Sequence, residues 1–142
     1  MDKCLFDGGW DEDVLKKTYY KWYSLLSESP HDILVVGNGG LTEEEQKVHF
    51  AIWCLVTAPL MLGNDPRNMS DFEKDIQLNA ECIAINQDPT EQGRKIIEDG
   101  DKEIWGKNLS DGSMAVLLLN RNKTENLTVE CNPDELGFGN NI

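Results

Sequence analysis

The sequence has few basic residues and few histidines. Its 142 residues include 13 Lys and Arg against 26 Asp and Glu, a formal net charge of −13, and only two histidines. Phosphate backbones and anionic lipid surfaces are bound by clustered Lys and Arg, so this balance argues against nucleic acid or a membrane surface as a partner. With two histidines and no serine in a Gly-x-Ser-x-Gly turn, the sequence also gives no support for a serine or cysteine hydrolase triad.

Long apolar runs and nucleotide-binding motifs are missing as well. No run approaches the roughly 20 apolar residues of a transmembrane helix. The first ten residues, Met1 to Trp10, contain Asp2, Lys3 and Asp7, which is not typical of a signal peptide. There is no P-loop, and Gly37-Asn38-Gly39-Gly40 does not match the dinucleotide fingerprint. No cofactor is therefore predicted.

The cysteines are too widely spaced for a metal-binding or redox motif. Cys4, Cys54, Cys82 and Cys131 form no Cys-x-x-Cys pair, so neither a zinc site nor a thioredoxin-like motif is predicted. The even number leaves disulfides open. Cys54 lies in a helical run, where a buried thiol is the more common outcome.

Four Asn-x-Ser/Thr sequons are present, at Asn68, Asn108, Asn122 and Asn126. About one would be expected by chance from the composition, so the sequence predicts N-glycosylation and a secretory-pathway origin. The alternative is accidental clustering of these residues in polar turns.

The first 90 residues alternate between strand-like and helix-like patterns. An apolar run at Cys4–Phe6 precedes an amphipathic pattern from Asp11 to Ser27. Two capping boxes, Thr42 with Glu45 and Ser70 with Glu73, open two further predicted helices. The predicted elements of this region are strands at 4–6, 33–36 and 60–62 and helices at 11–27, 42–57 and 70–78. This alternation is typical of βα units and a parallel sheet.

The last third of the chain, 91–142, has a different character. Short strand-like runs occur at 95–97, 103–105, 114–119 and 127–129. Ser110-Asp111-Gly112-Ser113 separates two of them and indicates a hairpin turn. These patterns predict an antiparallel β module.

Carboxylates beside strand ends and glycines are the remaining catalytic candidates. Asp7 follows an apolar run and precedes Gly8-Gly9, and catalytic groups on a parallel βα scaffold lie at the carboxyl ends of strands. The alternative for Asp7 is a cap on the following turn. Asp32, Asp65 and Asp88 have the same ambiguity, and the last two precede proline in ordinary turn pairs.

A series of motifs resembles one enzyme family. In order, these are Val36–Thr42, Phe50–Trp53, Ala58–Leu60, Gly63–Asp65, Arg67–Ser70 and Ile83–Pro89. Together they resemble the last strands and helices of the barrel in family 27 glycoside hydrolases, the α-galactosidases and α-N-acetylgalactosaminidases. Glu103–Trp105, Leu109–Ser113 and Leu119–Arg121 resemble the start of that family's C-terminal β domain.

The resemblance extends to possible active-site residues near the N-terminus. Asp2–Gly8 is similar to the family's nucleophile strand, and Asp7 falls on the nucleophile. Leu5 stands where the family has a sugar-binding lysine, and Gly9 stands where it has a disulfide cysteine. Asp32 matches an aspartate that hydrogen-bonds sugar hydroxyls. The family's acid/base aspartate has no counterpart, because 27–30 runs directly into His31-Asp32.

The resemblance implies an α/β fold with two parts. Residues 1–90 would form a partial (β/α)8 barrel, with 1–30 as the nucleophile strand and its helix and 31–90 as the last βα units. Residues 91–142 would begin an antiparallel C-terminal β domain. A complete barrel usually needs roughly 250 residues, so the resemblance implies a truncated, internally deleted enzyme.

The implied reaction is retaining hydrolysis of terminal α-galactosides, with Asp7 as nucleophile, no metal or other cofactor, and a lysosomal or secreted location. An α-galactoside or α-N-acetylgalactosaminide would be the ligand, and a homodimer is a possible assembly. Without the acid/base segment, we expect the chain alone to be inactive. The alternatives are a non-catalytic remnant that binds a sugar or a partner chain, and a fragment that has no stable fold alone.

Overall fold

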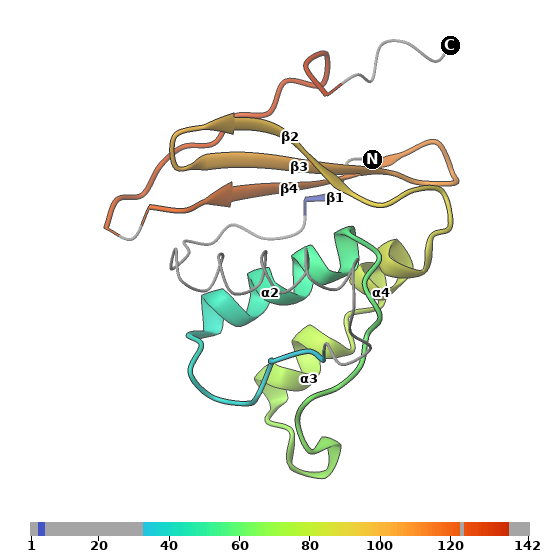
Figure 1. Cartoon of the computed structure of the whole chain (residues 1–142), viewed down its shortest axis with the longest axis vertical. Coiled ribbons are helices and arrows are strands. Elements are labelled where there is room, and N and C mark those ends of the chain that lie inside the picture. Colours follow the sequence, from blue (N-terminus) through green and yellow to red (C-terminus); the bar gives the residue numbers. More distant parts are fainter. Residues whose placement is uncertain (1–2, 5–32, 123, 137–142) are drawn as a thin grey trace, which may run out of the picture.

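The computed structural model describes residues 3–4, 33–122 and 124–136, which form a small sheet packed against three helices (Figure 1). The predicted helix at 11–27 lies outside the described residues. The helices are α2 (Glu43–Leu55), α3 (Asp71–Gln77) and α4 (Ala80–Gln87), with a 3-10 turn, η1, at Pro66–Asn68. The strands are β1 (Lys3–Cys4), β2 (Arg94–Asp99), β3 (Lys102–Asn108) and β4 (Met114–Asn120).

Both predicted capping boxes are confirmed. The Thr42 hydroxyl accepts from the Glu45 amide at 3.3 Å, and the Glu45 carboxylate accepts from the Thr42 amide at 2.7 Å. Ser70 and Glu73 repeat this arrangement at the start of α3. These boxes satisfy amides that have no partner within the helix, so they determine where α2 and α3 begin.

The helix ends and one whole helix differ from the predictions. α2 was expected to reach Thr57 but ends at Leu55, and Thr57 has a φ of +58°. A β-branched residue in the left-handed region cannot continue a helix. Helix α4, which begins after its N-cap Asn79, was not predicted. Its sequence, AECIAINQ, has too weak an apolar periodicity to indicate a helix.

The C-terminal module is an antiparallel sheet, as predicted. Strands β2, β3 and β4 pair antiparallel in sequence order. The turn between β3 and β4 is closed by the Leu109 amide, which donates to the Ser113 carbonyl at 2.8 Å, and Gly112 has a φ of +82°. The strand predicted at 127–129 is not formed, because this segment packs on the sheet face without a ladder partner.

The strand predictions in the first 90 residues were only partly correct. Lys3–Cys4 forms a strand, but it pairs in parallel with Ala115–Val116 of β4, giving the sheet order β1-β4-β3-β2. The resemblance had placed this strand in a barrel. The runs at 33–36 and 60–62 make a single parallel bridge, Leu34 to Leu62. The partial barrel therefore remains a prediction.

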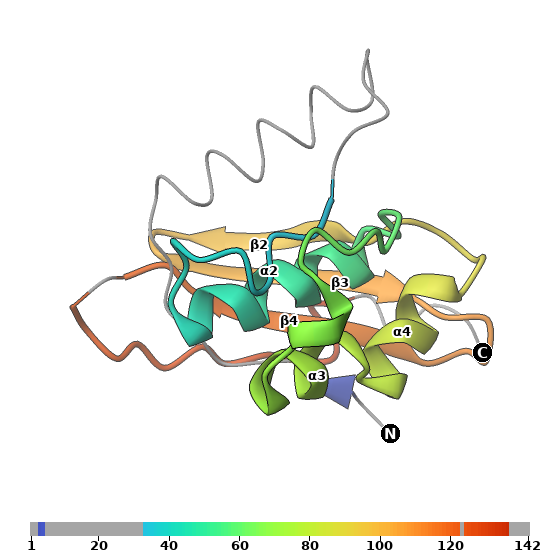
Figure 2. The same ribbon diagram turned by 90° about the horizontal axis from the view of Figure 1, so that it is seen from below.

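Apolar side chains are buried on both faces of the sheet. On one face, Trp105, Leu117 and Leu119 join the side chains of α2 and α4 in the larger core. On the other face, Ile104 and Val116 contact Leu136 and the half-buried Val129 in a smaller cluster. Figures 1 and 2 show the helices on one side of the sheet and the segment 124–136 on the other.

The prediction of a buried Cys54 thiol is confirmed, and Cys82 is also buried without a disulfide. No disulfide is formed among the described residues. Trp53 of α2 is 3% exposed, and its indole donates to the Pro59 carbonyl at 2.8 Å. Trp53 is therefore a core residue and not a surface for stacking sugars.

Candidate functional site

Two glycine-containing loops lie at one edge of the helical part of the molecule. One follows Leu34 and contains Gly37, and the other follows Leu62 and contains Gly63. The Leu34 amide donates to the Met61 carbonyl at 2.7 Å, and the Leu34–Leu62 bridge is parallel. Since parallel segments end at the same edge, the two loops emerge side by side.

The loops are packed against each other reciprocally. A Cβ atom on Gly63 would collide with the Leu34 carbonyl and lie 2.8 Å from Asn38 Nδ2. A Cβ atom on Gly37 would lie 2.8 Å from Asn64 Nδ2, and its φ of +79° also favours glycine. Each loop thus places an asparagine against the glycine of the other, and neither glycine can carry a side chain without displacing its neighbour.

Side chains from α2 and α3 hold the first loop in place. Gln46 accepts from the Gly37 amide at 2.9 Å and donates to the Leu41 carbonyl at 3.3 Å. His49 Nε2 accepts from the Val35 amide at 3.3 Å, while Gln77 donates to the Val36 carbonyl at 3.3 Å. Three side chains therefore fix a backbone that has no sheet ladder of its own.

Asn64 is the candidate residue that sequence reasoning missed. Its Nδ2 and Oδ1 atoms are both buried and have no hydrogen-bond partner among the described residues. The Oε1 atom of the nearly fully buried Gln77 is also without a partner there. An unsatisfied buried polar group costs about 1–3 kcal/mol. Polar side chains that remain unpaired in a buried position are therefore expected to have a role other than packing. The motif Gly63–Asp65 contains Asn64 but does not single it out, because Gly-Asn-Asp is also an ordinary turn sequence.

The two carboxylates in turn pairs are already engaged, Asp65 as the cap of η1 and Asp88 in bonds to Thr90 and Ser110. Asp65 accepts from Arg67 at 2.7 Å, 2.9 Å and 3.0 Å, and this hydrogen bonding lowers the pKa of its carboxyl. Asp88 accepts from the Ser110 hydroxyl at 2.7 Å, the Ser110 amide at 2.9 Å and the Thr90 amide at 3.0 Å. These bonds, with the Ser110 hydroxyl first, hold the Asp88 pKa well below its usual range. A general acid needs a raised pKa, so neither carboxyl fits that role.

The candidate catalytic residue Asp7 and the candidate sugar ligand Asp32 lie outside the described residues. The four sequon asparagines are described and all lie at the surface. Asn68, Asn108 and Asn126 are exposed and Asn122 is half-buried. Among the described residues, no group of three or more His, Cys, Asp and Glu side chains is arranged to hold a metal ion. Within the same residues, no helix has the length and apolarity needed to cross a bilayer.

Comparison with protein families identifies two consecutive matches. Residues 27–88 match the family described as alpha galactosidase A, and residues 99–141 match the alpha galactosidase C-terminal beta sandwich domain. The chain belongs to the α-galactosidase family. The resemblance noted in the sequence motifs is thereby confirmed, and both glycine loops lie inside the first match.

Individual α-galactosidases are similar over most of this chain. The α-galactosidase of Cyamopsis tetragonoloba is 45% identical over 108 residues, which are 75% of this chain and 26% of that protein. The crystal structure of α-galactosidase I from Mortierella vinacea matches 63% of this chain and 23% of its own, with a TM-score of 0.61 and 42% identity. The α-galactosidase of Saccharomyces cerevisiae, solved with raffinose, matches 63% of this chain and 22% of its own at 33% identity and a TM-score of 0.57.

This chain spans about a quarter of the length of the relatives it matches. The activity of those relatives is therefore a property of chains about four times as long as this match.

Proposed function

We propose that this chain is part of an α-galactosidase-type glycoside hydrolase and forms one side of its sugar site. The proposal rests on the two glycine loops. They follow the parallel bridge between Leu34 and Leu62, pack against each other, and lie within the family match at 27–88. In a (β/α)8 barrel the active site is built from the loops at this end of the strands. In this proposal residues 31–90 are the last βα units, and 91–142 begin the C-terminal β domain.

The proposed chemistry is retaining hydrolysis of a terminal α-galactoside. It needs two carboxyl groups about 5–5.5 Å apart, one that attacks the anomeric carbon and one that protonates the leaving oxygen. We assign the first role to Asp7 and assign hydrogen bonding to sugar hydroxyls to Asp32. Both assignments rest on the resemblance. The ligand is an α-galactoside or α-N-acetylgalactosaminide, and the location is lysosomal or secreted, with a homodimer as the possible assembly.

Within the proposal, the chain alone is inactive. The family's acid/base aspartate has no counterpart in the sequence, and the hydrogen bonds to Asp65 and Asp88 lower both pKa values and favour the ionised carboxylates. Loss of a general acid typically costs about 10²–10⁴-fold in rate. The engaged carboxyls also favour the second candidate function, a non-catalytic remnant that binds a sugar or a partner chain.

A chimera tests whether the loops retain the family geometry. Residues 27–136 would replace the aligned stretch of the Cyamopsis tetragonoloba α-galactosidase, and hydrolysis of an aryl α-galactoside would be measured. We expect activity well above background, and we expect Asp32→Asn in the same chimera to abolish it. A folded but inactive chimera would contradict the proposed role of these loops.

The isolated chain provides a second test. We expect no hydrolysis above background, and turnover that Asp7→Asn abolishes would show that another carboxyl had taken the acid role. Titration of the isolated chain with galactose, followed by NMR, separates the two candidate functions. Binding that Asp32→Asn removes, without turnover, would favour the remnant.

A further inference from the structure

The four sequons share one local pattern but lie in four different environments. An oligosaccharyltransferase must reach the asparagine amide and the Ser or Thr hydroxyl together, so the surroundings of both side chains decide whether the folded chain is an acceptor.

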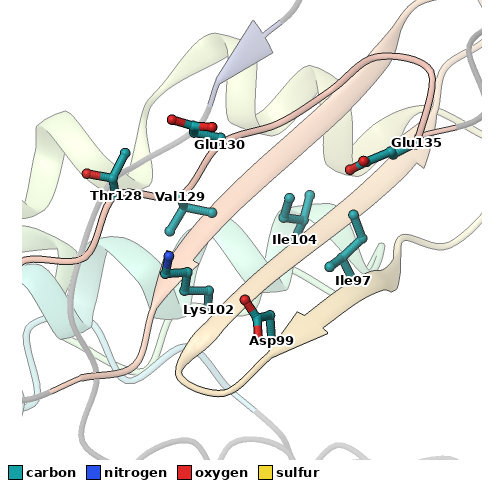
Figure 3. A pocket seen from close by; sticks show the side chains of 8 residues that line it. All are labelled: Ile97, Asp99, Lys102, Ile104, Thr128, Val129, Glu130 and Glu135. Carbon is teal, nitrogen blue, oxygen red and sulfur yellow. The ribbon is translucent and has the colours of Figure 1, made fainter.

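The sequon Asn126-Leu127-Thr128 lies over the smaller core cluster, in a segment where exposed and half-buried residues alternate with the two-residue period of an extended chain. Asn126 and Thr128 are exposed, whereas Leu127, Val129 and Cys131 are half-buried, and the last two pack against the sheet. In an extended backbone, side chains two residues apart point to the same side. Figure 3 shows Val129 directed toward the strands and Thr128 directed away from them. The segment therefore presents the Asn126 amide and the Thr128 hydroxyl together to solvent.

This segment also forms one wall of a cavity. The cavity has a volume of about 440 Å³ and is lined by Ile97 and Ile104 of the sheet together with Thr128 and Val129 (Figure 3). Val129 and Cys131 anchor the segment to the sheet by apolar contacts, whereas Asn126 and Thr128 are accessible to a modifying enzyme. Neither the Asn126 nor the Thr128 side chain forms a hydrogen bond with the described residues.

The sequon at Asn108 is engaged at both of its ends. Asn108 Nδ2 donates to Glu91 Oε1 at 2.7 Å, and the Ser110 hydroxyl donates to Asp88 Oδ2 at 2.7 Å. The Ser110 amide donates to the same carboxylate oxygen at 2.9 Å. These hydrogen bonds all have a charged acceptor, and binding of this sequon by an enzyme would break them.

The sequon at Asn122 is closed on itself. Asn122 Oδ1 accepts from the Thr124 amide at 2.9 Å, the Glu125 amide at 2.8 Å and the Thr124 hydroxyl at 3.2 Å. Asn122 Nδ2 donates to Asp101 Oδ2 at 2.9 Å. The acceptor nitrogen is thus paired with a carboxylate, and the hydroxyl is turned back onto its own asparagine.

The sequon at Asn68 is exposed, but its serine is engaged as a helix cap. Asn68 ends η1, and Ser70, the N-cap of α3, accepts from the Glu73 amide at 3.2 Å. The Ser70 amide in turn donates to the Glu73 carboxylate at 3.1 Å. The Ser70 hydroxyl is thus engaged in the capping box, so binding of this sequon by an enzyme would disrupt the start of α3.

We propose that Asn126 is the one N-glycan acceptor among the four sequons of the folded chain. In the transfer, Asn126 Nδ2 forms a bond to C1 of an oligosaccharide carried on a lipid pyrophosphate. The bond between C1 and the pyrophosphate oxygen breaks, the lipid pyrophosphate leaves with the electron pair, and Nδ2 loses one proton. The occurrence of this step in the cell rests on the secretory location in the proposed function, whereas the acceptor choice rests on the contacts above.

The test uses the purified, folded 142-residue chain with purified eukaryotic oligosaccharyltransferase and a lipid-linked oligosaccharide. Short synthetic peptides, one for each sequon, show which motifs are acceptors when unfolded. We expect all four peptides to be modified, whereas the folded chain gains a single glycan that peptide mass spectrometry locates at Asn126. Asn126→Gln and Thr128→Ala should abolish the electrophoretic shift, and Thr128→Ser should retain it.

The matched controls are Asn108→Gln and Asn122→Gln, which should leave the shift unchanged. Far-UV circular dichroism of each variant verifies that it is folded. Modification of the folded chain at Asn68, Asn108 or Asn122 at the rate of its peptide would overturn the proposal. So would a folded chain unmodified at Asn126 when the Asn126 peptide is accepted. Neither result bears on glycosidase activity, so the acceptor proposal and the proposed function can fail separately.

Discussion

Substitution of Lys107 should separate the sheet from the helices. Lys107 lies on β3 and is 0% exposed. Its Nζ donates to Ile85 O at 2.6 Å, Thr57 Oγ1 at 2.8 Å and Asp88 O at 3.0 Å. Ile85 and Asp88 lie at the C-terminal end of α4, where a positive charge is favoured by the helix dipole. One ammonium group on β3 therefore contacts both the C-terminal end of α4 and Thr57, the residue of positive φ that follows α2.

The expected cost follows from two opposing contributions. Three hydrogen bonds from a charged donor contribute about 1.5–3 kcal/mol each. Burial of the ammonium costs several kcal/mol, on the order of the loss seen for other buried ions, and burial lowers the Lys107 pKa. Lys107→Met keeps most of the side-chain volume but leaves three oxygens without this donor. We expect a loss of about 3 kcal/mol in the free energy of unfolding.

Urea unfolding followed by circular dichroism measures this loss. Lys102→Met is the matched control, because Lys102 lies on the same strand, is half-buried and forms no ion pair with the described residues. Its effect should stay within about 0.5 kcal/mol. If Lys107→Met were as stable as the parent chain, the desolvation cost of Lys107 would equal the free energy contributed by its hydrogen bonds. That result would refute the reasoning.

The Lys107 pKa adds a pH test with a defined sign. Because burial lowers this pKa, the unfolded chain binds more protons than the folded chain between the lowered value and the ordinary one of 10.5. Stability should therefore rise with pH in that window. Lys107→Met should lack this rise when the two chains are compared at each pH. A parallel pH dependence in both chains would contradict the assignment.

Three further predictions concern the loops, the caps and the thiols. Gly63→Ala should cost about 3 kcal/mol by overpacking, because its Cβ meets the Leu34 carbonyl, whereas Gly39→Ala, which meets no atom, should cost less in the same urea assay. Asp88 has a lowered pKa, so its stabilisation is present above about pH 3.8 and is lost as pH falls further. Asp88→Asn should flatten that acid limb, and an unchanged limb would argue against this role. Burial raises the pKa of Cys82 to about 11, so at pH 8 the native thiol should react with a disulfide reagent only as fast as the chain unfolds, and faster labelling would disprove its burial.

Local sequence signals predicted several elements because their causes are local. The box formed by Thr42 and Glu45 specifies the start of α2 within four residues. The Ser110–Ser113 turn likewise predicted the hairpin between β3 and β4, since its Gly112 adopts a positive φ.

Pairing with distant residues decided two outcomes that local patterns did not predict. The apolar run at 127–129 looks like a strand, but the sheet face offers it side-chain contacts and no ladder. Lys3–Cys4 forms a strand beside the run predicted at 4–6, but its parallel pairing with β4 was not predicted from the sequence. β propensity records only that a segment suits a pleated, half-buried surface, and it does not say which strand will be its neighbour.

The sequence by itself determined the family, the two capping boxes and the positions of the four sequons, because each is a pattern within a short stretch of chain. Only the tertiary structure decided which of these polar groups are already engaged. Lys107 is an ordinary lysine in the sequence, yet it is buried among oxygens of Thr57, which follows α2, and of Ile85 in α4. Asn122 and Asn126 have the same motif. Asn122 donates a hydrogen bond to Asp101, which lies 21 residues earlier in the chain, and Asn126 does not. Hydrogen bonds between distant residues depend on how the chain is folded, and no local pattern records them.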